Sequence, residues 1–325
     1  MNNINHHAKP LVADAEVVRH SLEKLQVRAA MEGLFRALAD GRAVQPAQTV
    51  TVFPHGAGDF ITYLGALANE HVFGAKLSPY LVTGGRPIVT AWTSLMSMLT
   101  GQPLLFCDSG LLTAERTAGT TALAIEQLAP EASLHLALIG AGALGQAHLR
   151  HVLPIRNWAS VSVYADDLAG NGNPETQARL QTLDSRVQIA ASARQCVSKA
   201  DVVMLCTSSA TPVLNLDDLS QPALITSIST NAVNAHEIPP SSLPFMDVYC
   251  DNKQRTPDSA GEMALAAKQG IWSREKVIGD LADLVSGRCA RPDYRRHVFF
   301  RSIGMGLEDV AIAHALLQYL QSNNA

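Results

Sequence analysis

The sequence predicts an α/β protein in which a parallel sheet follows a separate α+β region of roughly 115 residues. Three observations support this. From residue 132 onward, short β-type runs alternate with helical segments. Gly140, Gly142 and Gly145 follow the first of these runs in the pattern G-x-G-x-x-G. An amphipathic segment over residues 303–323 predicts a terminal helix, which we expect to return to the first region.

The first region begins with a helical pattern and continues with strand-like runs. Apolar positions recur at helical spacing over residues 14–40, and Gly41 supplies a stop signal. Strand-like runs broken by turn residues follow at 43–54, 60–68, 71–82 and 87–98. Residues 113–128, rich in alanine and leucine, predict a further helix.

The second region contains five short apolar runs separated by helical segments. They lie at residues 133–140, 161–167, 200–208, 222–230 and 246–252. Alternation of this kind predicts a parallel sheet with helices on both faces. We therefore expect this region to be a nucleotide-binding type of domain.

The composition fits a globular protein and argues against nucleic acid as a partner. Of the 325 residues, 47% are apolar and 17% are charged, the net charge is -4, and the isoelectric point is about 6.2. A protein that grips a phosphate backbone needs a basic surface, which this chain lacks.

Cysteine usage and the N-terminus bear on metal binding and localisation. The five cysteines are scattered and show no C-x-x-C, so we expect neither a disulfide framework nor a metal site. The N-terminus is polar and lacks the signature of a secretory signal. No apolar run approaches the ~20 residues that span a bilayer. These features predict a cytoplasmic protein without a membrane partner.

The glycine pattern has the context of a dinucleotide-binding turn, because an apolar run precedes it and a helical segment follows. Gly140 would make the tight turn, Gly142 would let the backbone approach a pyrophosphate, and Gly145 would let helix and strand pack closely. A purely structural turn is the alternative. The expected cofactor-binding residues here are Gly140, Ala141, Gly142, Ala143, Leu144 and Gly145.

An acidic residue lies where this fingerprint expects a ligand for the ribose hydroxyls. Asp166 follows Gly145 by 21 residues, at the end of the second apolar run. Because a carboxylate repels a 2′-phosphate, Asp166 favours NAD(H) over NADP(H) as the cofactor. Asp166 could equally be a solvated loop acid.

Four segments taken together resemble the successive motifs of the ornithine cyclodeaminase/μ-crystallin family. They occur in order, with sensible gaps, over almost the whole chain: "KLSPY" at 76–80, "LLTAERTAGTTALA" at 111–124, "LIGAGALGQAH" at 138–148, and "RSIGMGLEDVAIAHA" at 301–315. The combination is far more specific than any one of the four motifs.

The resemblance implies a Rossmann NAD(P)-binding domain at 116–307, inserted into a substrate-binding and dimerisation domain formed by 1–115 and 308–325. It also implies a homodimer. Members of the family bind NAD(H) or NADP(H) and include ornithine cyclodeaminase, alanine dehydrogenase, cyclic ketimine reductases and a thyroid-hormone-binding crystallin.

Two cations are candidates for the catalytic site. Lys76 lies in an otherwise apolar run, where a buried lysine is costly unless it meets an anion. The family equivalent contacts the substrate carboxylate and can assist proton transfer. Arg116 opens "RTAGTTA", and a guanidinium can clamp a carboxylate in bidentate fashion. The alternatives are an edge-strand lysine and an exposed helix arginine.

At two positions the chain departs from the cyclodeaminase pattern. Gln48 stands where many members carry an arginine, as a second carboxylate clamp. Asn231 stands six residues before Glu237, where cyclodeaminases carry an aspartate that handles the amino group of ornithine. An amide is no general base, so these changes argue against ornithine deamination.

Further positions are expected near the cofactor. Thr207 and Ser208 follow a predicted strand, at a place that commonly lines the cofactor, and Thr117 adds a hydroxyl beside Arg116. Ser302 and Gly304 resemble the loop on the nicotinamide side in this family. Asp309, near the start of the terminal helix, could be an ordinary charge on a solvated face.

These observations predict an NAD(P)H-dependent ketimine reductase. It would reduce Δ1-pyrroline-2-carboxylate or Δ1-piperideine-2-carboxylate to L-proline or L-pipecolate, with Lys76 and Arg116 holding the carboxylate. The alternatives are an ornithine cyclodeaminase, a dehydrogenase of a linear amino acid, and a non-catalytic binder of a small ligand.

Overall fold

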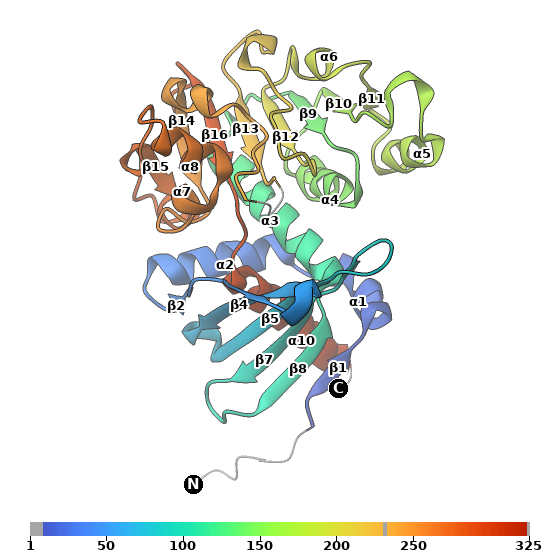
Figure 1. The fold of residues 1–325 in the computed structure, drawn as a ribbon, viewed down its shortest axis with the longest axis vertical. Coiled ribbons are helices and arrows are strands. Elements are labelled where there is room, and N and C mark those ends of the chain that lie inside the picture. The colour runs from blue at the N-terminus through green and yellow to red at the C-terminus, as the bar shows by residue number, and fades with distance from the viewer. Residues whose placement is uncertain (1–8, 230–232, 324–325) are drawn as a thin grey trace. The chain divides into compact units, whose positions relative to one another are not determined.

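The computed structural model describes residues 9–229 and 233–323, and the chain forms two compact units (Figure 1). Unit 1 comprises Met1–Thr117 and Met305–Ala325, and unit 2 comprises Ala118–Gly304. The chain leaves unit 1 within helix α3 (Gly110–Leu128) and returns to it just before helix α10 (Gly306–Asn323). Helix α10 is therefore the predicted terminal helix.

Unit 1 is built on a mainly antiparallel sheet. Its central path runs in the order β1-β8-β7-β5-β4-β2, with β3 paired to β4 and β6 paired to β5. Only the β1–β8 pair is parallel among these pairings. The strands are β1 (Leu11–Ala13), β2 (Ala43–Val44), β3 (Thr49–Val52), β4 (Gly58–Leu67), β5 (Val72–Leu81), β6 (Ile88–Val89), β7 (Trp92–Ser97) and β8 (Pro103–Asp108).

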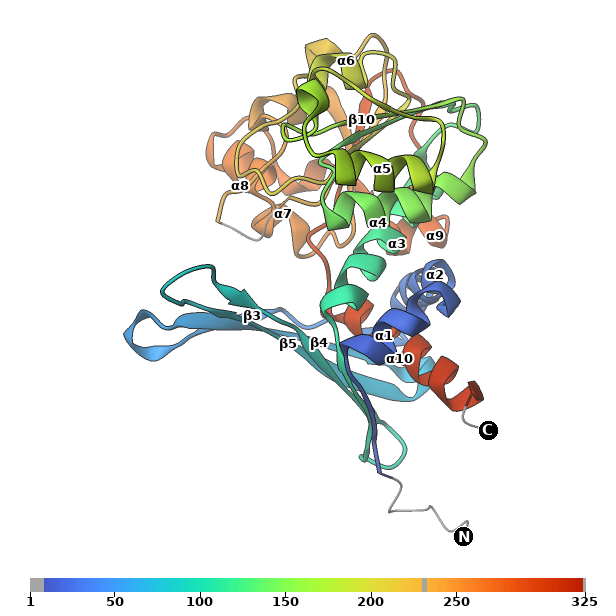
Figure 2. The same ribbon diagram turned by 90° about the vertical axis from the view of Figure 1, so that its right-hand side faces the viewer.

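Helices cover one face of this sheet. Figure 2 shows α1 (Ala15–Ser21), α2 (Val27–Ala39) and α10 on the same side of β4 and β5. Alternate residues of β5 point to this face, so Val72, Gly74 and Lys76 are buried while Phe73 and Leu77 are exposed. The strand pattern thus separates a helix-covered face from an apolar face that the described helices leave open.

Two glycines let the first turn of α10 lie directly against β4. A Cβ on Gly65 would lie 2.8 Å from the Leu307 Cα, and one on Gly306 would lie 2.5 Å from the Leu64 nitrogen. A larger residue at either position would push helix and strand apart. This close approach places the residues after Gly306 against the covered face of the sheet.

The helical pattern over 14–40 forms two helices, with a break that the pattern itself does not show. Between α1 and α2 lies a short 3-10 turn, Leu22–Lys24, after which Leu25 adopts an extended backbone. Leu25 donates its N–H to the Leu22 carbonyl, which closes the turn and ends the first helix. Asp14 caps α1 by accepting from the N–H groups of Glu16 and Val17.

Unit 2 is a parallel sheet of the doubly wound type, as the alternating pattern predicts. Its order is β11-β10-β9-β12-β13-β16-β14-β15, and every pair is parallel (Figure 1). The strands are β9 (His135–Ile139), β10 (Ser160–Tyr164), β11 (Val187–Ile189), β12 (Val202–Leu205), β13 (Leu224–Ser227), β14 (Met246–Cys250), β15 (Val277–Asp280) and β16 (His297–Arg301).

The strand order reverses at β9, which lies between β10 and β12. In open α/β sheets such a reversal forms the crevice that binds a ligand at the carboxyl ends of the strands. The remaining helices of unit 2 are α4 (Ala143–Val152), α5 (Pro174–Leu183), α6 (Ala193–Val197), α7 (Thr256–Ser259), α8 (Gly261–Lys268) and α9 (Leu281–Val285). Among the described residues, no helix is long and apolar enough to cross a membrane.

Candidate functional site

The glycine turn joins β9 to α4, and its three glycines have different surroundings. Gly140 has a φ of +102°, and a Cβ there would lie 2.4 Å from the Cys206 carbonyl oxygen. A Cβ on Gly145 would lie 2.0 Å from the Gly140 carbonyl oxygen. A Cβ on Gly142, the N-cap of α4, would meet nothing within 4 Å. Two glycines are therefore required by packing, whereas the third leaves the backbone open to a ligand.

A hollow of about 800 Å³ lies over this turn. Most of the residues that we predicted to bind the cofactor line it, namely Gly140, Ala141, Gly142, Ala143, Leu144, Asp166, Thr207 and Ser208. The free N–H groups at the start of α4 favour an anion such as a pyrophosphate. The turn, the hollow and the helix N-terminus together suit an adenine dinucleotide.

Asp166 lies on the rim of the hollow, just after β10. Its side chain is exposed and accepts a hydrogen bond of 2.7 Å from the Tyr164 hydroxyl. This hydrogen bond raises the pKa of the Tyr164 hydroxyl. Asp167 accepts from the Asn173 amide at 2.8 Å. Asp166 therefore lies at the position expected of a ribose ligand, next to a second carboxylate.

Lys76 lies on the covered face of the unit 1 sheet and is only 2% exposed. Its Nζ donates to the Asp309 Oδ1 at 3.0 Å and to the Thr113 Oγ1 at 3.3 Å. It also lies 4.3 Å from the ring centre of Tyr63, the residue paired with Lys76 across β4 and β5. Burial lowers the pKa of Lys76 below its ordinary value, although the nearby Asp309 opposes this effect.

Arg116 approaches the same carboxylate from α3. Its Nε donates to the Asp309 Oδ1 at 3.1 Å, and its Nη1 donates to the Glu308 Oε2 at 2.6 Å. All three side chains are nearly inaccessible to solvent. Burial opposes the charge of Arg116, but Asp309 and Glu308 outweigh it and raise the pKa of the guanidinium.

Lys76, Arg116, Glu308 and Asp309 form what we call the charge cluster, two cations and two carboxylates whose formal charges sum to zero. The interpretation of Asp309 as a surface charge is wrong, because only 2% of it is exposed. Glu308 was not predicted as a site residue from the sequence. Like Lys76, Glu308 is a charged residue within a largely apolar stretch, and this pattern could have identified it.

Of three other predicted positions, the two that the structure describes do not join this cluster. Gln48 is exposed just before β3, whereas nearby Gln45 accepts the Leu307 N–H at 2.8 Å, at the start of α10. The Thr117 hydroxyl donates to the Thr113 carbonyl one turn earlier in α3. Asn231 lies outside the described residues.

Ser302 and Gly304 lie in a loop that a buried carboxylate organises. The Asp251 Oδ2 accepts from the Ser302 hydroxyl at 2.9 Å and from the N–H groups of Ile303 and Gly304 at 2.7 and 2.9 Å. The other oxygen, Oδ1, accepts from the Asn252 N–H at 2.8 Å. Neither Ser302 nor Gly304 lines the hollow over the glycine turn.

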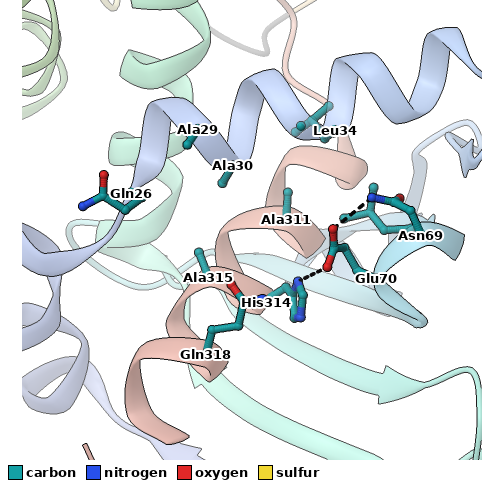
Figure 3. Close-up of a pocket in the computed structure, with 12 residues that line it drawn as sticks. Gln26, Ala29, Ala30, Leu34, Asn69, Glu70, Ala311, His314, Ala315 and Gln318 are labelled. Carbon is teal, nitrogen blue, oxygen red and sulfur yellow. Dashed lines mark hydrogen bonds and ion pairs between the residues drawn. The ribbon is translucent and has the colours of Figure 1, made fainter. Parts of the chain in front are cut away.

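A separate, smaller hollow of about 240 Å³ lies between α2 and α10 in unit 1 (Figure 3). Small side chains form much of its wall, and Glu70 receives a hydrogen bond from Asn69 and an ion-pair contact of 3.9 Å from His314. Burial lowers the pKa of His314, which opposes its protonation. None of the described site residues lines this hollow.

Comparisons with known proteins point to one family. The sequence profile of the ornithine cyclodeaminase/mu-crystallin family matches residues 8–324. The NAD(P)H-dependent anabolic L-arginine dehydrogenase DauB of Pseudomonas aeruginosa is 51% identical to this chain over 318 residues, which cover 97% of this chain and 99% of that protein.

Solved structures show the same fold. The Δ1-pyrroline-2-carboxylate reductase of Thermococcus litoralis, solved with NADH and L-proline, matches with a TM-score of 0.87 at 23% identity, covering 97% of this chain and 98% of that one. An archaeal alanine dehydrogenase dimer with bound NAD matches with a TM-score of 0.84 at 21% identity, covering 97% of each chain.

Proposed function

This chain belongs to the ornithine cyclodeaminase/mu-crystallin family, and we propose that it is an NAD(P)H-dependent oxidoreductase acting on the carbon–nitrogen bond of an imino or amino acid. The observation that carries the proposal is the 800 Å³ hollow over the glycine turn, with Asp166 on its rim. The imine gains a hydride at carbon and a proton at nitrogen, and the coenzyme is oxidised to NAD(P)⁺.

The residues around the hollow fit the coenzyme and favour NADH. Gly142 leaves room for a pyrophosphate beside the start of α4, and Gly140 and Gly145 keep the turn close to the sheet. Asp166, oriented by Tyr164, suits the ribose hydroxyls and repels a 2′-phosphate. A nicotinamide bound here supplies the hydride, and the protein supplies binding and orientation.

The charge cluster suits a substrate that carries a carboxylate and a protonated imine. The four buried charges sum to zero. A bound substrate with a net negative charge would leave one buried charge without a partner, and such a charge is costly. A zwitterionic head group, made of a carboxylate and a protonated imine, keeps the sum at zero, with the carboxylate on Lys76 and Arg116 and the nitrogen facing Asp309. The lowered pKa of Lys76 also suits proton transfer.

The first substrate to test is the imino acid of L-arginine. The 51% identity to an L-arginine dehydrogenase extends over nearly all of both chains, which supports a common substrate. This choice replaces the cyclic ketimine as the leading candidate but keeps the same reaction, reduction of a C=N bond next to a carboxylate. The cyclic ketimines remain second, because Gln48 and Asn231 lack the charges of the cyclodeaminase pattern.

A panel of substrates tests the proposal. Purified protein is mixed with NADH or NADPH and one of three substrates: the 2-oxo acid of arginine with ammonia, Δ1-pyrroline-2-carboxylate, or Δ1-piperideine-2-carboxylate. We expect coenzyme oxidation fastest with the first and faster with NADH than with NADPH. Ammonia release from ornithine without net coenzyme turnover would instead identify a cyclodeaminase.

The open face of the unit 1 sheet supports a homodimer. Leu64, Phe73, Leu77 and Phe106 are 39%, 39%, 46% and 44% exposed on strands that form one continuous sheet. Contiguous apolar surface of this kind marks an interaction site. We infer that a second copy of the chain covers it, as the dimeric state of the archaeal alanine dehydrogenase suggests.

A further inference from the structure

A fully buried carboxylate, Glu237, holds together two loops at the carboxyl edge of the unit 2 sheet. Its Oε1 accepts from the Thr207 N–H at 2.8 Å and from the Thr207 hydroxyl at 2.7 Å. Its Oε2 accepts from the Ser227 hydroxyl at 2.7 Å and from the Ser229 N–H at 3.0 Å. One side chain thus receives four hydrogen bonds from the ends of β12 and β13.

These loops flank the coenzyme hollow. Thr207 lines the hollow together with Ser208 and Ser209, and the Ser209 N–H donates back to the Thr207 hydroxyl at 3.2 Å. The Glu237 carbonyl also accepts the N–H of Val213, another lining residue, at 2.9 Å. Both ends of the lining segment after β12 are therefore tied to the same residue.

Ser229 adopts a conformation that requires support. Its φ is +41°, a left-handed value that non-glycine residues rarely adopt and that strains the backbone. The hydrogen bond from its N–H to Glu237 helps to hold this backbone in place. Ser229 precedes the candidate residue Asn231 by two positions in the sequence.

We propose that Glu237 is a positioning residue, whose carboxylate sets the shape of the Thr207–Ser209 wall of the coenzyme hollow and the backbone at Ser229. The inference rests on the proposed function, because it assigns the hollow to a nicotinamide coenzyme. Glu237 itself is absent from the lining and acts through the residues that it holds.

Glu237→Gln is the direct test. An amide keeps the shape of the side chain, but only one of its two ends accepts, so either the Thr207 pair or the Ser227 and Ser229 pair loses its acceptor. We expect the dissociation constant for NADH, measured by fluorescence titration without substrate, to rise about tenfold or more. A dissociation constant within about twofold of wild type in the folded variant would overturn the proposal.

Two control variants show whether weaker NADH binding comes from the lost hydrogen bonds of Glu237 or only from a lost charge or a lower stability. Glu131→Gln removes an exposed carboxylate of the same unit and should leave NADH binding unchanged. Leu180→Ala opens the core beneath α5 without touching the hollow, so it should lower the unfolding midpoint but not the affinity of the folded protein. Equal weakening of binding by Leu180→Ala would show a general effect of instability and contradict the proposal.

A milder variant and a double-mutant cycle keep the test decisive if Glu237→Gln does not fold. Ser227→Ala removes one of the four donors without changing a residue that lines the hollow, and we expect a measurable rise in the NADH dissociation constant. The effects of Thr207→Val and Ser227→Ala should be non-additive, because both act through one carboxylate. Strict additivity would contradict the proposal. Failure of the wild-type protein to bind either coenzyme would instead remove the proposed function.

Discussion

Asp309 accepts hydrogen bonds from two buried cations, Lys76 and Arg116. Asp309→Asn should therefore lower the free energy of unfolding by about 3–5 kcal/mol, because it leaves a buried positive charge without its partner. The matched control is Asp40→Asn, which breaks an exposed pair with Arg42 and should change stability by about 1 kcal/mol or less. Urea unfolding of both variants measures the difference, and equal effects would contradict the buried balance.

The charge cluster could be predicted from the sequence only in part. Lys76 and Arg116 stand out as charges in apolar or motif contexts, whereas their partners lie 233 and 193 positions away along the chain. No local pattern reports such a pairing, because it depends on the close packing of α10 on β4. For this reason the sequence left open whether Asp309 is a buried partner or a solvated surface charge.

In the turn between β9 and α4, packing requires a glycine at 145, whereas we expect coenzyme binding to require the glycine at 142. Gly145→Ala forces a methyl group against the Gly140 carbonyl and should lower the free energy of unfolding by about 1–3 kcal/mol. Gly142→Ala points into open space, so it should cost about 1 kcal/mol or less while weakening NADH binding.

The two variants are compared by urea unfolding and by fluorescence titration with NADH. Gly33→Ala, also in open space but within α2, is the control and should leave NADH binding unchanged. Tight NADH binding by Gly142→Ala would contradict the placement of the pyrophosphate at this turn.

The parallel sheet was predictable because each of its strands carries a local apolar pattern and the glycine turn marks its first crossover. All five predicted runs form strands, β9, β10, β12, β13 and β14. Strands β11, β15 and β16 went unpredicted. The break between α1 and α2 was also missed, because the helical periodicity continues across the 3-10 turn at Leu22–Lys24.

At the scale of the whole molecule, the open sheet face predicts an oligomer that a single charge can disrupt. Leu77→Lys places an ammonium on the exposed face of β5, where a second copy would have to bury it. Sedimentation should show a dimer for the wild type and a monomer for the variant. Ile278→Lys, an exposed position in unit 2, is the control and should remain dimeric. A monomeric wild type would refute the interface.

In the proposed reaction, a reduced nicotinamide coenzyme delivers its hydride to the imine carbon of an amino-acid precursor. Transfer of deuterium from the coenzyme to the product reports this step. The protein is mixed with the 2-oxo acid of arginine, ammonia, and NADH that carries deuterium at C4 of the nicotinamide ring, on the face from which the enzyme takes the hydride. The product is examined by mass spectrometry. We expect L-arginine with one deuterium on its α-carbon. Coenzyme oxidation without deuterium in any amino-acid product, or no reaction with any substrate of the panel, would contradict the proposed reaction.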